Sequence, residues 1–78
     1  MPTALRNGAH RFFFYAGDGG EPRHVHVERD GKTAKFWLEP VELQTNKGFS
    51  QVEIRTVCRI IIENRLKLLE AWNGYFHG

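Results

Sequence analysis

The sequence has little of what stabilises secreted domains or anchors membrane proteins. Cys58 is the one cysteine among 78 residues, so no internal disulfide can form, and a reducing intracellular compartment is expected. No run is long and apolar enough to span a bilayer, and the segment Met1 to Arg6 has no apolar core of signal-peptide length. We therefore expect a cytoplasmic protein without a membrane partner.

A strong excess of one charge is also missing. Eleven basic and nine acidic residues give a net charge of +2, which permits a nucleic-acid partner but does not by itself indicate one. The chain shows no internal repeat, and we expect one domain over residues 1–78. Folding at this size buries only roughly 60% of the unfolded chain's surface, so the six Phe, two Tyr and two Trp residues matter for the core.

What the sequence does contain is a hairpin that fixes its own geometry. Alternating runs flank Asp30-Gly31, a dipeptide that favours a two-residue type I′ turn. This turn places Arg29 opposite Lys32 and, further out, His24 opposite Trp37. Paired residues share a face, so one face is apolar: Val25, Val27, Ala34, Phe36 and Leu38. The other face carries His24, His26, Glu28, Thr33, Lys35 and Trp37.

Other turn signals divide the rest of the first half. Asn7-Gly8 predicts a hairpin between strands near 3–6 and 9–15. The second of these strands has aromatic residues on both faces, so alternation does not show which face points into the core. Residues 16–22 are interpreted as a mobile connector rather than a phosphate loop, because they lead into a strand and lack a Walker lysine. After Pro40, residues 41–43 can continue as an edge strand before a turn at 44–48.

A long helix is predicted next. Ser50 and Glu53 form a capping box, and Asn73-Gly74 gives a stop signal, so the helix spans about 51–73. Arg65 lies within its apolar stripe and Ile60 lies off it. The stripe itself consists of Ile54, Val57, Cys58, Ile61, Ile62, Leu68, Leu69 and Trp72. Strands followed by one helix predict an α+β fold: an antiparallel sheet of two consecutive hairpins, with three to five strands over about 3–43, packed against one long C-terminal helix.

This helix would be longer than the sheet it covers. It would measure about 33 Å, against about 20–27 Å for a strand of six to eight residues. Trp72, Tyr75 and Phe76 crowd its far end, and Ile60 points away from the stripe. Large exposed apolar patches usually mark interfaces, so we expect a homodimer through the C-terminal helix, or contact with a partner there.

The polar face of the second hairpin offers two chemical hypotheses. In the first, the protein is a metal-independent endoribonuclease. His24 and His26 act as general acid and base, and Lys35 stabilises the negative charge of the phosphorane. In the second, His24 and His26 bind a metal with a third ligand from Glu28, His10 or His77. A solvated strand face gives the same His-Val-His-Val pattern, so we count neither a metal nor another cofactor among the expectations.

A third hypothesis is a binding surface. Trp37, flanked by His24, Lys35 and Glu39, would form an amphipathic patch typical of protein or nucleic-acid interfaces. In the alternative, Trp37 packs under the loop at Asp18 or against the C-terminal tail. Arg65 is expected to pair with a sheet carboxylate such as Glu39 or Glu42.

The sequence resembles the small bacterial family known as domain of unknown function 4160. The segments that carry the resemblance are Met1-Pro2-Thr3 with Arg6, Phe14-Tyr15, Pro22 with His24–Val27, Ala34–Leu43, Gly48-Phe49-Ser50, and Trp72 with Tyr75-Phe76. Arg23 departs from the family, which usually has a second proline there. The resemblance implies a partner-binding component of a toxin–antitoxin-like gene pair, whose partner is a cognate small protein encoded nearby. As a separate hypothesis, the protein also binds RNA or DNA. The resemblance assigns no catalytic residues, and whether the protein is an enzyme stays open.

Overall fold

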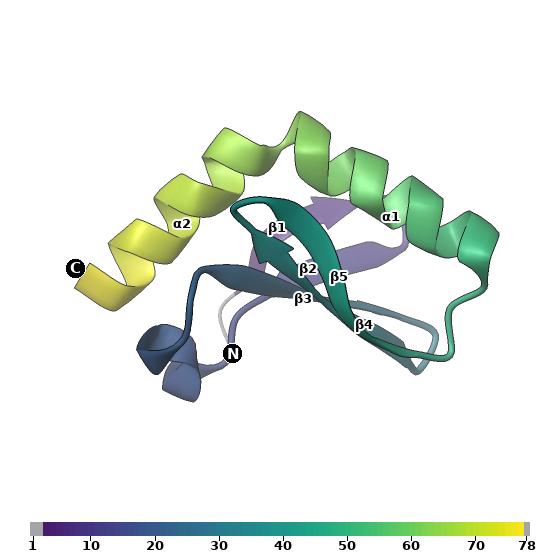
Figure 1. Ribbon diagram of the computed structural model, residues 1–78, viewed down its shortest axis with the longest axis horizontal. Helices are drawn as coiled ribbons and strands as arrows, with labels where there is room; N and C mark the ends of the chain where they lie inside the picture. Colours follow the sequence, from purple (N-terminus) through teal and green to yellow (C-terminus); the bar gives the residue numbers. More distant parts are fainter. Residues whose placement is uncertain (1–2, 78) are drawn as a thin grey trace.

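Five antiparallel strands form a single sheet, and two helices cover one of its faces (Figure 1). The computed structural model describes residues 3–77, without the side chain of residue 77; Met1 and Pro2 of the family resemblance lie outside this range. The elements are β1 (Thr3–Asn7), β2 (His10–Phe13), the short 3₁₀ helix η1 (Ala16–Gly20), β3 (His24–Arg29), β4 (Lys32–Leu38), β5 (Val41–Lys47), α1 (Gln51–Glu63) and α2 (Arg65–His77). The strands lie in sequence order across the sheet. This is the predicted α+β fold.

Both predicted hairpins form, and the second has its turn at the predicted residues. Asp30 and Gly31 have positive φ angles of 51° and 78°, as a type I′ turn requires. The β3–β4 register pairs Arg29 with Lys32 and His24 with Trp37, as predicted. The turn of the first hairpin lies one residue later than predicted, at Gly8 and Ala9, since Asn7 belongs to β1 and pairs with His10.

The strand β5 is longer than expected. Residues 44–47, predicted as a turn, continue the strand opposite 33–35, and the register shifts between Lys35 and Phe36. The prediction of a turn was wrong because it rested on polar composition. An edge strand presents polar residues to water without losing its pairing to the inner neighbour.

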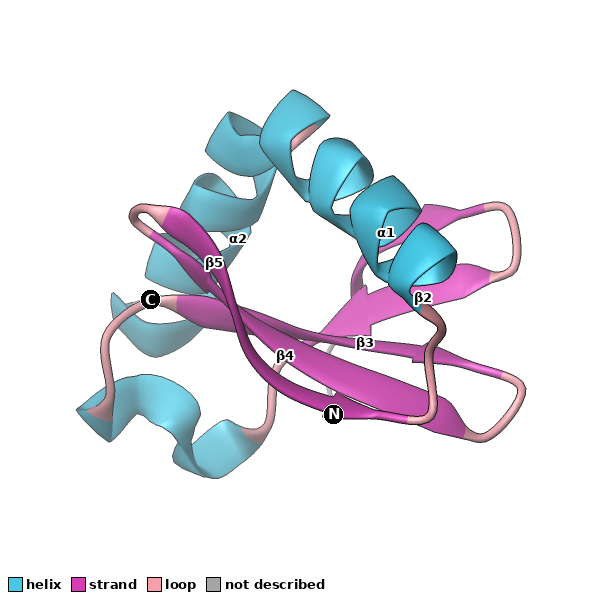
Figure 2. Ribbon diagram, turned by 45° about the vertical axis from the view of Figure 1, so that its right-hand side comes forward, coloured by secondary structure: helices cyan, strands magenta, loops and turns pink. Residues whose placement is uncertain are grey.

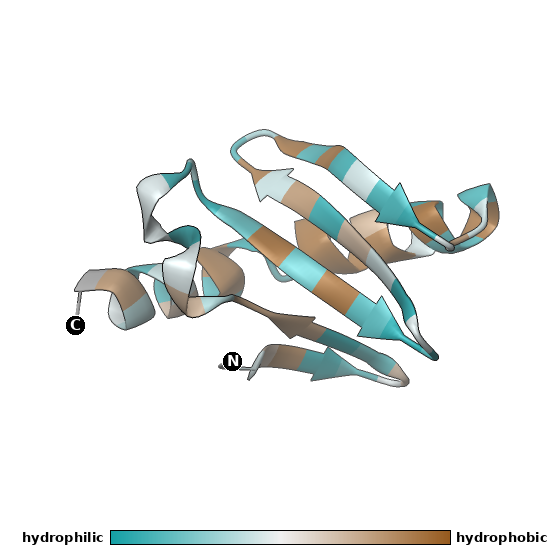
Figure 3. Cartoon of the chain, turned by 90° about the horizontal axis from the view of Figure 1, so that it is seen from below, coloured by the Kyte–Doolittle hydropathy of each residue, from teal (hydrophilic) through white to brown (hydrophobic). Residues whose placement is uncertain are grey.

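The core lies between the sheet and the helices. The predicted apolar face of the second hairpin is fully covered, and the sequence pattern appears as alternating polar and apolar bands along the strands (Figure 3). Phe12 and Phe14 of the aromatic run join this core, whereas the neighbouring Phe13 is buried on the other side of the sheet. The helices contribute Val57, Ile60, Ile61, Leu68, Leu69 and Trp72.

The single long helix is a correction. Asn64 interrupts it, with φ −115° and ψ 18°, and its side-chain amide donates to the carbonyl of Ile60 at 2.8 Å. A side chain that bonds the backbone in this way competes with helical pairing, so α1 and α2 meet at an angle (Figure 2). The stop at Asn73-Gly74 was also wrong, because α2 continues to His77.

The dimer was predicted because a single long helix would extend beyond the sheet, and the break at Asn64 removes that extension. Ile60, expected off the core stripe, turns inward and is 7% exposed, while Ile62, expected on it, is 57% exposed. Phe76 packs on Trp72, with ring centroids 4.3 Å apart. Self-association through α2 stays a prediction, now without Ile60, and would use the exposed Leu66 and Tyr75.

No helix in the described part of the chain is long and apolar enough to cross a membrane.

Candidate functional site

The predicted polar face of the second hairpin lies on the side of the sheet opposite α1 and α2 (Figure 3). The register places His24 and His26 on β3 beside Trp37 and Lys35 on β4. Among residues 3–77, η1 is the helical segment that packs on this side, at the end where β3 begins (Figure 1). The four predicted residues therefore share one face, part of it covered and part of it open.

The segment interpreted as a mobile connector folds into η1 and supplies a residue that the sequence reasoning missed. The backbone N–H of Tyr15 donates to Asp18 Oδ2 at 2.9 Å, and the N–H of Asp18 donates to the carbonyl of Tyr15 at 3.1 Å. This reciprocal pair fixes the turn, and Asp18 is buried despite its charge. A buried carboxylate needs partners, and the two histidines provide them.

Asp18, His24 and His26 together form what we call the histidine cluster. Asp18 Oδ2 lies 3.0 Å from His24 Nε2 and 3.0 Å from His26 Nε2. On its other side, His24 donates from Nδ1 to the carbonyl of Pro22 at 2.8 Å. One carboxylate oxygen thus faces two imidazole nitrogens from neighbouring same-face positions of β3.

The cluster shifts the acidity of its members. Burial alone would raise the pKa of Asp18, but the N–H of Tyr15 and the charges of His24 and His26 together hold that pKa below its usual value. Burial lowers the pKa of His26 below that of a free imidazole, and Asp18 offsets only part of this effect. The carboxylate is therefore ionised and His26 is neutral near pH 7.

His24 and His26 differ in what can reach them. The side chain of His24 is fully buried, between the edges of Trp37 and Trp72 at centroid distances of 5.7 and 5.0 Å. His26 keeps some exposure and packs against Phe13 and Tyr15. A substrate could touch His26, but it could reach His24 only if η1 or α2 moved.

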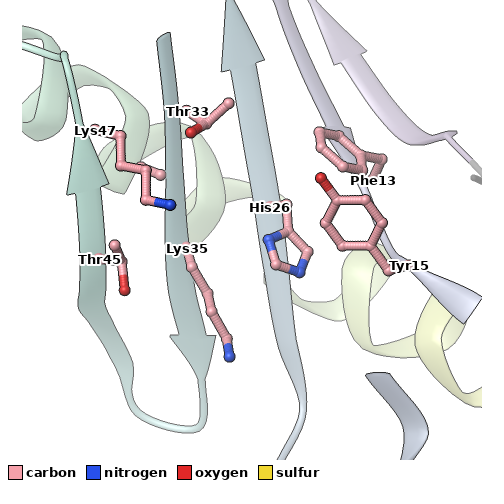
Figure 4. Close-up of a pocket in the computed structure, with 8 residues that line it drawn as sticks. Phe13, Tyr15, His26, Thr33, Lys35, Thr45 and Lys47 are labelled. Carbon is pink, nitrogen blue, oxygen red and sulfur yellow. The ribbon is translucent and has the colours of Figure 1, made fainter. Parts of the chain in front are cut away.

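A shallow pocket of about 210 Å³ opens beside His26 (Figure 4). Its side chains come from β2 to β5 and from Tyr15, which lies between β2 and η1. We call the surface around it the open face: Phe13, Tyr15, His26, Thr33, Lys35, Thr45 and Lys47. Lys35 is not free, because its Nζ donates to Glu21 at 2.6 Å and lies 4.9 Å from the Trp37 ring. Lys47 makes no ion pair with any described residue.

The predicted binding residues meet at the far end of β4. Arg65 donates from Nε to the carbonyl of Leu38 at 2.9 Å and approaches Glu39 at 3.6 Å. Its predicted pairing with Glu39 is present. Glu39 also accepts a bond from Arg23 at 2.7 Å. Trp37 is half-buried beside His24, with ring centroids 5.7 Å apart. Its role in a binding patch stays a prediction.

The residues that the sequence suggested as a third metal ligand, Glu28, His10 and His77, are not part of the histidine cluster as far as the structure describes them. Glu28 is bound by Arg11 at 3.0 Å. His10 lies on the helix side of the sheet, 3.4 Å from Glu53. The side chain of His77 lies outside the described residues. The one signal for Asp18 in the sequence was an acidic residue in a glycine-rich loop just before the His-Val-His strand.

Residues 10–73 match the family described as Domain of unknown function (DUF4160). The chain belongs to this family. The DUF4160 match includes every member of the histidine cluster and the strands β2 to β5 that carry the open face. No curated protein and no solved structure matches the chain. The family description carries no activity, so the function has to be argued from the site.

Proposed function

We propose that this protein is the partner-binding component of a bacterial, cytoplasmic two-protein module of the toxin–antitoxin kind. Its partner would be the cognate small protein encoded beside it. The observation that carries the proposal is the open face: on the side of the sheet opposite α1 and α2, the part not covered by η1 holds a pocket between aromatic and cationic side chains. Aromatic side chains such as Phe13 and Tyr15 are enriched at protein interfaces.

The chemistry of the open face favours an acidic protein segment as its ligand. Tyr15 is 44% exposed and offers a ring and a hydroxyl, while Lys47 offers a cation that no described carboxylate neutralises. Nucleic acids usually require several phosphate contacts. Here Glu21 already occupies Lys35, and the net charge is only +2. RNA is therefore the alternative outcome of the test.

The geometry gives less support to the metal-independent endoribonuclease. An acid and a base must stand on opposite sides of the reacting phosphate, whereas His24 and His26 both face Asp18. His24 is also fully enclosed. Lys35, the proposed cation, is held by Glu21.

Charge reversal on the open face tests the proposal. In Lys47→Glu, affinity for the co-purified cognate protein should fall by at least about tenfold, because a cation that faces an acidic segment becomes a repelling charge. Isothermal titration calorimetry would measure the change. The matched control is Lys67→Glu, an equally exposed lysine on α2, which should bind like the unaltered protein.

Two results would count against this function. Equal loss of affinity in Lys47→Glu and Lys67→Glu would show that the interface is not specific to the open face. If the cognate protein does not bind at all while single-stranded RNA binds in a Lys47-dependent way, the open face is a nucleic-acid surface instead.

A further inference from the structure

We propose that Asp18, His24 and His26 form a site for one divalent transition-metal ion of the zinc class. The proposal stands apart from the partner-binding function and rests on the histidine cluster alone. Each residue offers one ligand atom, and the three atoms lie within 4.8 Å of one another. Two imidazoles and one carboxylate are a ligand set that Zn²⁺ and Fe²⁺ favour.

The distances suit a shared ion. Metal bonds of about 2.0–2.1 Å at angles between octahedral and tetrahedral place two ligand atoms about 2.9–3.4 Å apart. Oδ2 of Asp18 lies 3.0 Å from Nε2 of His24 and 3.0 Å from Nε2 of His26. A small movement of the side chains would open the centre of this triangle for an ion.

The buried Nε2 atom of His24 is a further observation that supports a metal site, independent of the distances. The Nδ1 atom of His24 faces the carbonyl of Pro22 at 2.8 Å, and a carbonyl only accepts, so Nδ1 carries the proton. Its Nε2 is fully buried and has no hydrogen-bond partner among the described residues, although Asp18 Oδ2 is 3.0 Å away. The two atoms are therefore close without being aligned for a hydrogen bond. With the proton on Nδ1, the Nε2 lone pair is left to bind a cation beside the Asp18 carboxylate.

A shared metal ion accounts for this arrangement of the side chains. The misaligned Nε2–Oδ2 contact suits two ligands that point at a common third atom rather than at each other. The Pro22 carbonyl holds the ring in the way that outer-shell carbonyls usually hold metal-binding histidines. The backbone N–H of Tyr15 holds the Asp18 carboxylate in a similar way, by donating a hydrogen bond to it.

The position of the cluster gives such an ion a route to ligands. His26 lines the open face as well as the cluster, so an ion held there would lie at the rim of the pocket. Three protein ligands with an open position are typical of zinc sites that bind a further molecule. Cys58 is not a candidate fourth ligand, because it packs against the core on the helix side.

Titration of the chelator-stripped, full-length protein with Zn²⁺ alone tests the site. We expect one ion per chain by calorimetry, and binding weakened at least about 100-fold in Asp18→Asn and in His26→Gln. The controls His10→Gln and Glu28→Gln should stay within about threefold, since these side chains lie outside the cluster. Circular dichroism would confirm that each variant is folded.

Cobalt provides a readout that needs no variant. One equivalent of Co²⁺ should give intense visible bands of a low-coordinate nitrogen and oxygen site, which Zn²⁺ then removes. Stoichiometric binding that survives Asp18→Asn, the absence of saturable binding to folded protein, or the weak spectrum of hydrated Co²⁺ would each overturn the proposal.

Discussion

Replacing Trp72 by alanine is expected to lower the free energy of unfolding by about 3–5 kcal/mol, the usual cost of deleting a buried aromatic side chain. Trp72 is buried where α2 meets the end of the sheet. Its ring contacts Phe14, Phe76 and His24, at centroid distances of 5.3, 4.3 and 5.0 Å. A chain of this length has only about 4–12 kcal/mol to lose, so the variant should be close to unfolding.

Urea denaturation followed by circular dichroism would measure this loss. Leu66→Ala is the control, because Leu66 lies on the same helix but is 72% exposed; it should change stability by no more than about 0.5 kcal/mol. If Trp72→Ala lowers the free energy of unfolding by less than about 1 kcal/mol, then α2 does not pack across the end of the sheet. In that case α2 would not cover His24 either.

The second large effect is stabilisation by zinc. The histidine cluster exists only when η1 is folded against β3, so an ion that binds there favours the folded state. With free Zn²⁺ at 100 times its dissociation constant, the free energy of unfolding should rise by about 2.7 kcal/mol. For a domain of this size this corresponds to a melting temperature about 10–20 °C higher.

Thermal melts with and without zinc would show the shift, and a chelator should reverse it. His26→Gln should melt at the same temperature in both conditions. His10→Gln should keep the full zinc shift, because His10 lies on the opposite side of the sheet near Glu53. A zinc shift of equal size in His26→Gln would place the ion somewhere else.

The parts of this fold that were predictable are those governed by short-range rules. Asp30-Gly31 sets its turn through backbone preference, and alternation then assigns every side chain of β3 and β4 to a face. The pairing of His24 with Trp37 and of His26 with Lys35 follows from the turn alone. The site residues on this hairpin could therefore be named before the structure was known.

Two of the failed predictions depend on contacts that the sequence does not display. Asn64 has an ordinary place in a helical pattern, and its bond to the Ile60 carbonyl becomes effective only because both halves of the helix then pack on the sheet. The misfits Ile60 and Arg65 were in fact its signal, because they flank the break on either side. Asp18 was missed because glycine-rich composition indicates mobility, whereas its two histidine partners hold the loop down.

The most direct test of the metal centre is the state of the His24 ring. Long-range ¹H–¹⁵N correlation spectra of the folded protein would report Nδ1 and Nε2 separately, before and after one equivalent of Zn²⁺. The account predicts a proton on Nδ1 of His24 in both states, and a large zinc-induced shift at Nε2 of His24 and His26 with none at His10. A proton on Nε2 of His24 that persists when zinc is present would contradict it.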